Sequence, residues 1–154
     1  MSNQAHYEER RAAFAADAAS RTGIDERLIA TVVHGFYAKI QADAVLAPIF
    51  AARIADWDPH LERMCAFWSS VVLMTGRYHG QPMQKHLPLP VGAAHFDRWL
   101  ELFAETAREL CPPAAAEVFI EKASLIAQSL ELGIAGHRGL LLAKGARLPV
   151  TDDA

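Results

Sequence analysis

Histidine, tyrosine and tryptophan side chains are the groups in this sequence best suited to chemistry. The chain has 154 residues, and its seven histidines are His6, His34, His60, His79, His86, His95 and His137. None of them forms the H-E-x-x-H pattern of a zinc protease, and neither Cys65 nor Cys111 lies in a C-x-x-C spacing. The G-x-S-x-G, Walker A and G-x-G-x-x-G motifs are also absent. The residues therefore do not support a classical hydrolase, kinase or dinucleotide-binding protein.

Four side chains place a polar or sulfur-containing tip among apolar neighbours. They are Tyr37, His60, Met64 and Trp99. If they line one cavity, a phenol, an imidazole and an indole N–H converge in an otherwise apolar space. An imidazole opposite them, that of His86, would suit the fifth coordination position of a haem iron.

Helices are the elements that must position these side chains. Apolar residues at steps of three and four predict core helices at about residues 24–40, 58–75, 96–110 and 118–133. Alternating strand patterns are absent, which predicts an all-α fold. Gly35 inside the first helix costs about 1 kcal/mol relative to alanine, so we expect the second helix to cross closely there. Gly133 is expected to end the fourth helix.

A stretch rich in proline and glycine, residues 76–92, separates the second and third predicted helices. Pro82, Pro88 and Pro90 allow at most one or two helical turns, around residues 82–86. His86 stands at the end of that short turn. Loops between well-formed helices often carry functional residues, so this loop is a candidate site.

Composition points to one soluble domain. We expect a core domain at residues 21–135, an N-terminal helical extension at residues 1–20 and a loosely held C-terminal tail at residues 136–154. Hydrophobic residues make up 52% of the chain, and the net charge of −3 includes no basic stripe for nucleic acid. The apolar runs are too short to span a membrane, and the first residues lack signal-peptide order. These features predict a cytoplasmic protein.

Six short motifs in order resemble those of the group III truncated haemoglobins. They are Phe36-Tyr37, Pro48-Ile49-Phe50, Trp57-x-x-His60, Phe67-Trp68, Gly80-x-Pro82-x-x-x-His86-Leu-x-Leu-Pro90 and Trp99-Leu100-x-Leu-Phe103. Each motif alone is weak, but their shared order over residues 24–133 is specific. The resemblance implies a two-over-two helical sandwich, which is a shortened globin fold, with non-covalently bound haem b.

The resemblance also implies a role for each candidate residue. His86 would be the proximal ligand of the iron. The polar distal residues would be Tyr37, His60 and Trp99. Phe50 would pack on the porphyrin face, and Met64 would line the distal side. The basic or hydrogen-bonding candidates for the haem propionates are Arg77, Lys85, Arg98, Tyr78 and His79.

The implied function is reversible binding of oxygen, carbon monoxide and nitric oxide at a histidine-ligated iron. Three polar distal groups predict tight retention of oxygen rather than easy delivery. That property favours nitric oxide dioxygenation or peroxide chemistry over simple oxygen transport. Such reactions need an electron donor, and no flavin or nicotinamide motif is visible. We therefore expect a separate, unidentified donor.

Two other classes stay open on the residues alone. A non-haem helical metalloprotein would use His79, His86 and His95 as its ligands. A haem-free sensory or interaction domain would keep the globin fold without the cofactor. An absorption spectrum separates the three, because only a haem protein gives a Soret band.

Overall fold

The computed structural model describes residues 3–150, apart from the side chains of residues 14–20. Within this range the chain forms helices and no β-strand. The helices are α1 (Asn3–Thr22), α2 (Glu26–Ala42), α3 (Ala47–Ala51), α4 (Trp57–Leu73), α5 (Pro82–His86), α6 (Ala93–Leu110) and α7 (Pro113–His137). The predicted all-α fold is confirmed. Among the described residues, no helix combines the length and apolar character needed to cross a membrane.

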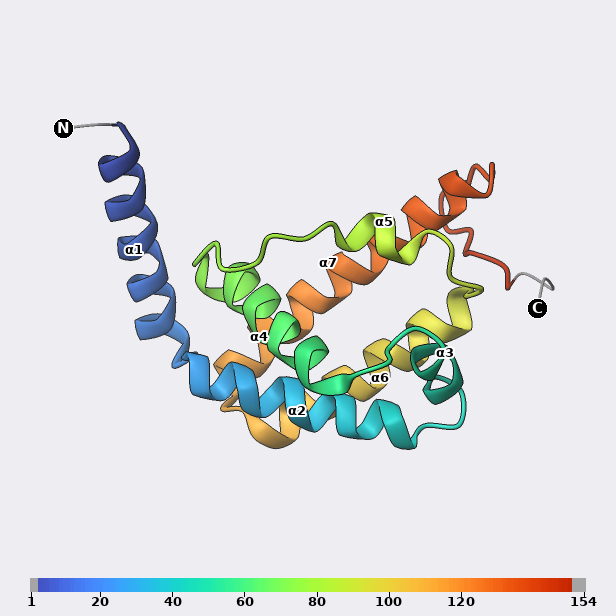
Figure 1. Cartoon of the computed structure of the whole chain (residues 1–154), viewed down its shortest axis with the longest axis horizontal. Coiled ribbons are helices and arrows are strands. Elements are labelled where there is room, and N and C mark those ends of the chain that lie inside the picture. The colour runs from blue at the N-terminus through green and yellow to red at the C-terminus, as the bar shows by residue number, and fades with distance from the viewer. Residues whose placement is uncertain (1–2, 151–154) are drawn as a thin grey trace.

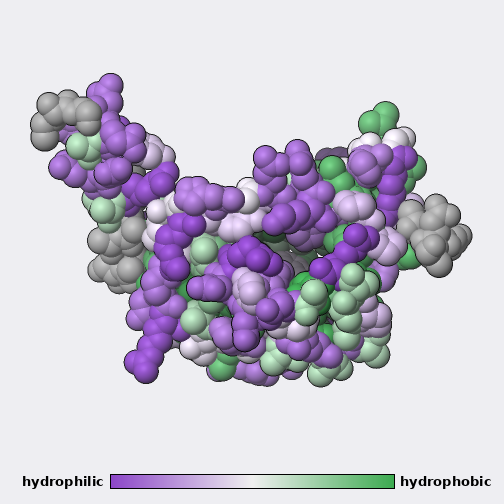
Figure 2. Space-filling view, viewed as in Figure 1, coloured by the Kyte–Doolittle hydropathy of each residue, from purple (hydrophilic) through white to green (hydrophobic). Residues whose placement is uncertain are grey.

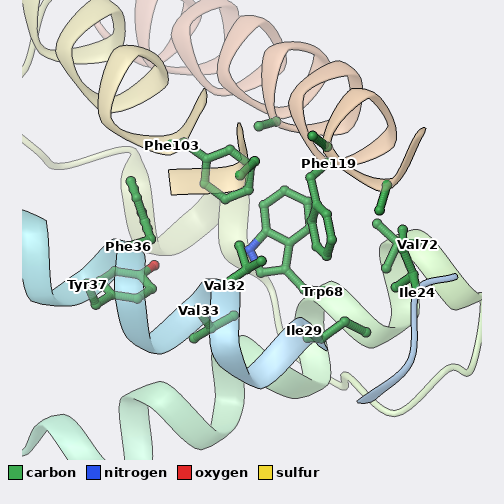
Figure 3. Close-up of a cluster of buried hydrophobic side chains, with 14 of the residues drawn as sticks. Ile24, Ile29, Val32, Val33, Phe36, Tyr37, Trp68, Val72, Phe103 and Phe119 are labelled. Atoms are coloured by element: carbon green, nitrogen blue, oxygen red, sulfur yellow. The ribbon is translucent and has the colours of Figure 1, made fainter. Parts of the chain in front are cut away.

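Two helix pairs form the core. Helix α2 packs against α4, helix α6 packs against α7, and the α2–α6 contact joins the two pairs (Figure 1). Large side chains fill the space between them, with Trp68 lying beside Phe103 and Phe119 (Figure 3). The Trp68 and Phe103 rings stack at 17° with centroids 4.9 Å apart. The predicted two-over-two arrangement is confirmed.

Local signals fix where the core helices begin and end. The Asp25 carboxylate accepts a hydrogen bond from the Leu28 N–H at 2.8 Å, which caps α2. At the start of α6, His95 Nδ1 accepts a hydrogen bond from the Gly92 N–H at 2.9 Å. Pro113 occupies the first turn of α7, where its missing N–H has no intrahelical partner to lose.

Two glycines have different roles from those the sequence predicts. Helix α7 continues past Gly133, where a Cβ atom would overlap Met83 of α5. This glycine therefore permits close contact between α5 and α7 and does not end the helix. A Cβ atom on Gly35 would lie 2.8 Å from Leu110 Cδ1, so the close neighbour is α6 and not the predicted second helix, α4.

Helix α1 stands away from the two core pairs (Figure 1). Its contacts are with α4 and α7. The Arg11 guanidinium lies over the Tyr7 ring at 4.7 Å and so pairs with a neighbour on the same helix. Helix α1 covers most of the N-terminal extension expected at residues 1–20. The division of the chain into this extension and a core domain stays a prediction.

The C-terminal segment is packed, contrary to the expectation of a loosely held tail. Leu148 is only 2% exposed. Its carbonyl accepts a hydrogen bond from the Ala93 N–H at 2.7 Å, and its N–H donates to Glu131 Oε1 at 2.9 Å. Arg147 bonds the same Glu131 carboxylate at 2.8 Å and Asp97 at 2.8 Å. These contacts hold the segment against the start of α6 and the end of α7.

The burial of Leu148 leads to a stability prediction. Leu148→Ala removes a buried side chain and should lower the free energy of unfolding by about 2–5 kcal/mol. Leu141 lies in the same segment but is 100% exposed, so Leu141→Ala is the matched control and should change stability by less than about 0.5 kcal/mol. Urea unfolding of both variants measures this. Equal, small effects would show that the segment is loosely held after all.

Candidate functional site

Four aromatic side chains meet where α2, α3 and the start of α4 come together. The Tyr37 ring lies 5.1 Å from the His60 ring, 6.0 Å from Phe50 and 5.8 Å from Trp57. His60 also meets Trp57 edge-on at 5.6 Å. The structure therefore brings together three candidate site residues, Tyr37, Phe50 and His60. Trp57 lies between them as a fourth aromatic side chain.

The His60 imidazole is the most unusual polar group in this cluster. Its Nε2 atom is buried and has no hydrogen-bond partner in the described part of the chain. Burial, followed by the positive charges of Arg63 and Lys85, lowers the pKa of His60 from 6.5 to about 4. The imidazole is therefore neutral near pH 7. A buried polar atom without a partner is costly, which is typical of a position that receives a ligand.

The Tyr37 hydroxyl is held in its protonated form. Tyr37 is 6% exposed, and burial raises its pKa well above the usual value. The phenol therefore remains a hydrogen-bond donor at every physiological pH.

Trp99 and Met64 extend the same apolar lining. The Trp99 ring lies edge-on to Phe36 at 5.5 Å and stacks on Phe103 at 5.5 Å. Phe36 in turn contacts Tyr37 at 5.0 Å, so Trp99 joins the cluster through Phe36. Met64 is partly buried against the same core.

His86 is the last residue of α5. Its Nδ1 atom lies 2.5 Å from the Pro82 carbonyl oxygen, four residues earlier. A carbonyl can only accept, so Nδ1 carries a proton, and in the neutral imidazole the lone pair is then on Nε2. This is the arrangement that metal-binding histidines adopt, because a carbonyl on one nitrogen orients the other toward the metal.

The residues present fit a haem group. An imidazole with a lone pair on Nε2 and a buried imidazole without a partner come from two different helices, α5 and α4. Aromatic and aliphatic side chains supply the apolar walls that a porphyrin needs. Figure 2 shows a hollow near the centre of the face that is turned to the viewer, with hydrophobic residues inside it.

The structure does not support a cluster of three histidines. Within the described residues, no group of three or more His, Cys, Asp or Glu side chains is placed to hold a metal ion. His95 Nδ1 is occupied by the cap of α6, and His79 is exposed on the loop before α5. The non-haem metalloprotein built on His79, His86 and His95 therefore lacks its expected geometry.

Trp57 is a lining residue that the sequence analysis quotes in a motif but to which it assigns no role. Its ring lies nearly parallel to that of Phe50 at 6.5 Å and contacts both Tyr37 and His60. Its spacing in the sequence could have indicated this role, because residues three apart share a helix face and His60 follows Trp57 by three residues.

Comparisons with known proteins show the family of this chain. Residues 20–124 match the sequence profile of the bacterial-like globin family. The chain is also 33% identical over 113 residues to Group 3 truncated hemoglobin ctb of Campylobacter jejuni, covering 70% of this chain and 89% of that protein. The chain therefore belongs to the bacterial-like globins and is a haem globin.

Two solved hemoglobin structures are also similar to this chain in fold. The group III truncated hemoglobin from Campylobacter jejuni matches with a TM-score of 0.66 and 31% identity, covering 77% of this chain and 92% of that one. The hemoglobin from Chloroflexus aurantiacus matches with a TM-score of 0.61 and 25% identity, covering 73% and 95%. The predicted resemblance to the group III truncated haemoglobins is confirmed.

The depressed pKa of His60 leads to a pH prediction. Between about pH 4 and pH 6.5 the unfolded chain binds a proton at His60 and the folded chain does not, so folding stability rises with pH. His60→Leu removes this proton linkage. The variant should lose less stability than the wild type between about pH 7 and pH 5, by on the order of 1 kcal/mol after allowance for solvent screening.

The measurement is urea unfolding of both apoproteins at the two pH values. His34→Leu is the control because His34 is exposed on α2, away from the aromatic cluster. If the wild type and His60→Leu lost stability equally, the burial of a neutral His60 would be wrong.

Proposed function

We propose that this globin binds haem b with His86 as the proximal iron ligand, and that it binds oxygen, carbon monoxide and nitric oxide on the opposite side. The observation that carries the proposal is the hydrogen bond from His86 Nδ1 to the Pro82 carbonyl at 2.5 Å, which leaves Nε2 available. When bound, haem supplies an iron centre that takes up diatomic ligands.

The distal side is proposed to consist of Tyr37, His60 and Trp99, with Phe50 and Met64 as apolar lining. A diatomic ligand that gains negative charge needs hydrogen-bond donors. The protonated Tyr37 phenol is such a donor, and the Trp99 indole supplies a second N–H. The buried Nε2 of His60 has no other partner, so it can bond the ligand without breaking an existing hydrogen bond.

Lys85 and Arg63 are the proposed partners of the haem propionates. Of the candidates identified in the sequence, Arg77 pairs with Glu26 at 2.6 Å and Arg98 pairs with Asp43 at 2.7 Å. Lys85 makes no ion pair among the described residues. Its charge and that of Arg63 both lower the pKa of His60, which supports the proposal that the two cations lie near the site.

The proposed physiological role follows from this donor set. Several donors slow the release of a polar ligand, which favours chemistry on that ligand over oxygen transport. Nitric oxide dioxygenation or peroxide chemistry are the proposed reactions, with a separate electron donor in the cytoplasm. A haem-free sensory domain is the alternative, and the absence of a Soret band would favour it.

The proximal assignment is tested by His86→Ala. The variant should bind haem weakly, and added imidazole should restore part of the binding by filling the space left by the side chain. The exposed His79 provides the control, and His79→Ala should keep the wild-type absorption spectrum. A wild-type ferrous and carbon monoxide spectrum in His86→Ala would show that the proximal assignment is wrong.

The distal donors are tested by Tyr37→Phe and Trp99→Phe. A hydrogen bond to a charged group is worth about 1.5–3 kcal/mol, so each change should speed oxygen dissociation roughly tenfold or more. Carbon monoxide carries little negative charge when bound, so its dissociation should change much less. Because both donors serve one ligand, the double variant should show a non-additive effect.

Stopped-flow displacement measures these rates. Tyr7→Phe is the matched control, since Tyr7 is exposed on α1 and lies outside the aromatic cluster around His60. If oxygen and carbon monoxide dissociation changed equally in Tyr37→Phe, the hydrogen-bond explanation would fail.

A further inference from the structure

Helix α5 depends on its surroundings for its position. It has five residues, too few for a helix to be stable by itself. The chain before it, residues 74–81, has no regular secondary structure, and the chain after it holds Pro88 and Pro90, which have no N–H to donate. Whatever fixes the loop at residues 87–92 therefore helps to fix the His86 imidazole.

The Arg138 side chain binds this loop from the end of α7. Its Nη2 donates to the Leu89 carbonyl at 2.8 Å and to the Val91 carbonyl at 2.9 Å. These two carbonyls flank Pro90. The Leu89 N–H in turn donates to the His86 carbonyl at 3.1 Å. One hydrogen bond therefore separates the residue that Arg138 holds from His86 itself.

The C-terminal segment completes the attachment. Arg138 Nη1 donates to the Pro149 carbonyl at 3.0 Å, so one guanidinium joins the loop after α5 to the segment after α7. Next to Pro149, Leu148 is buried in a cluster with Val91, Phe96 and Ile134, against which Leu87 and Leu89 pack. Hydrogen bonds from a charged donor are stronger than neutral ones, which makes Arg138 the central link of this clamp.

Arg138 and residues 147–149 lie beyond the family match, which ends at residue 124, whereas the loop that they hold lies within it. We propose that Arg138 is a positioning residue that, together with the packed segment at residues 147–149, fixes the His86 imidazole on the proximal side. The inference rests on the proposed role of His86 as the iron ligand. Arg138 acts through the loop at residues 87–92 and does not itself touch the cofactor.

The test uses Arg138→Gln and Arg138→Lys in the full-length chain loaded with haem. Resonance Raman spectroscopy of the ferrous protein reports the iron–histidine stretching frequency. We expect a lower frequency in Arg138→Gln, together with roughly tenfold faster transfer of haem to an acceptor apoglobin, as for other losses of support around a ligating histidine. Arg138→Lys keeps the positive charge but lacks the planar guanidinium. Its iron–histidine frequency and its rate of haem transfer should therefore lie between those of the wild type and Arg138→Gln.

Arg77→Gln is the matched control. It also removes a guanidinium, here one paired with Glu26 on the stretch before α5, so it should reduce stability without changing the iron–histidine frequency. An unchanged frequency in Arg138→Gln would overturn the proposal, as would an equal shift in Arg77→Gln. If Arg138→Gln retained no haem, Arg138→Lys would be measured instead. A lower iron–histidine frequency in Arg138→Lys would support the proposal, and an unchanged frequency would overturn it.

The two proposals fail in distinguishable ways. If His86→Ala kept the iron–histidine band of the wild type, the proposed function would be wrong whatever Arg138 does. If the band depended on His86 but not on Arg138, only the positioning role would be wrong.

Discussion

The hydrogen bond between the His86 ring and the Pro82 carbonyl is the constraint on which the proposed proximal side depends. It sets the tautomer of the imidazole, but it lies within a single helical turn and cannot place that turn in space. Placement comes from α7, where Gly133 lets Met83 approach and Arg138 holds the following loop. A short helix thus gains from a long one the rigidity that it cannot supply itself.

The proposed distal side includes a polar group that reduces stability. The buried His60 Nε2 has no partner among the described residues, which disfavours folding in the absence of a ligand. The aromatic core around Trp68, Phe103 and Phe119 compensates through extensive apolar burial. Cofactor and ligand would relieve this cost, so the site is one that binding stabilises.

The fold and most of the site could be predicted from the sequence because helical periodicity and ordered motifs are local signals. Tyr37, Phe50 and His60 do lie together, as their motifs indicate. The roles of Gly35 and Gly133 could not be predicted, since a glycine that ends a helix and one that admits a neighbour look alike in sequence. The packing of Leu148 depends on partners far away in the chain, which no local pattern reports.

The long reach of the Arg138 contact has a consequence for the order of assembly. Arg138 follows Leu89 by 49 residues, so the nascent chain presents His86 well before its clamp has been synthesised. Contacts between distant residues form late, because closing a long loop costs entropy before the contact is gained. During synthesis, α2 and α4 can therefore begin to pack before the loop at residues 87–92 is secured. Haem captured earlier would meet an imidazole on a loop that is not yet anchored.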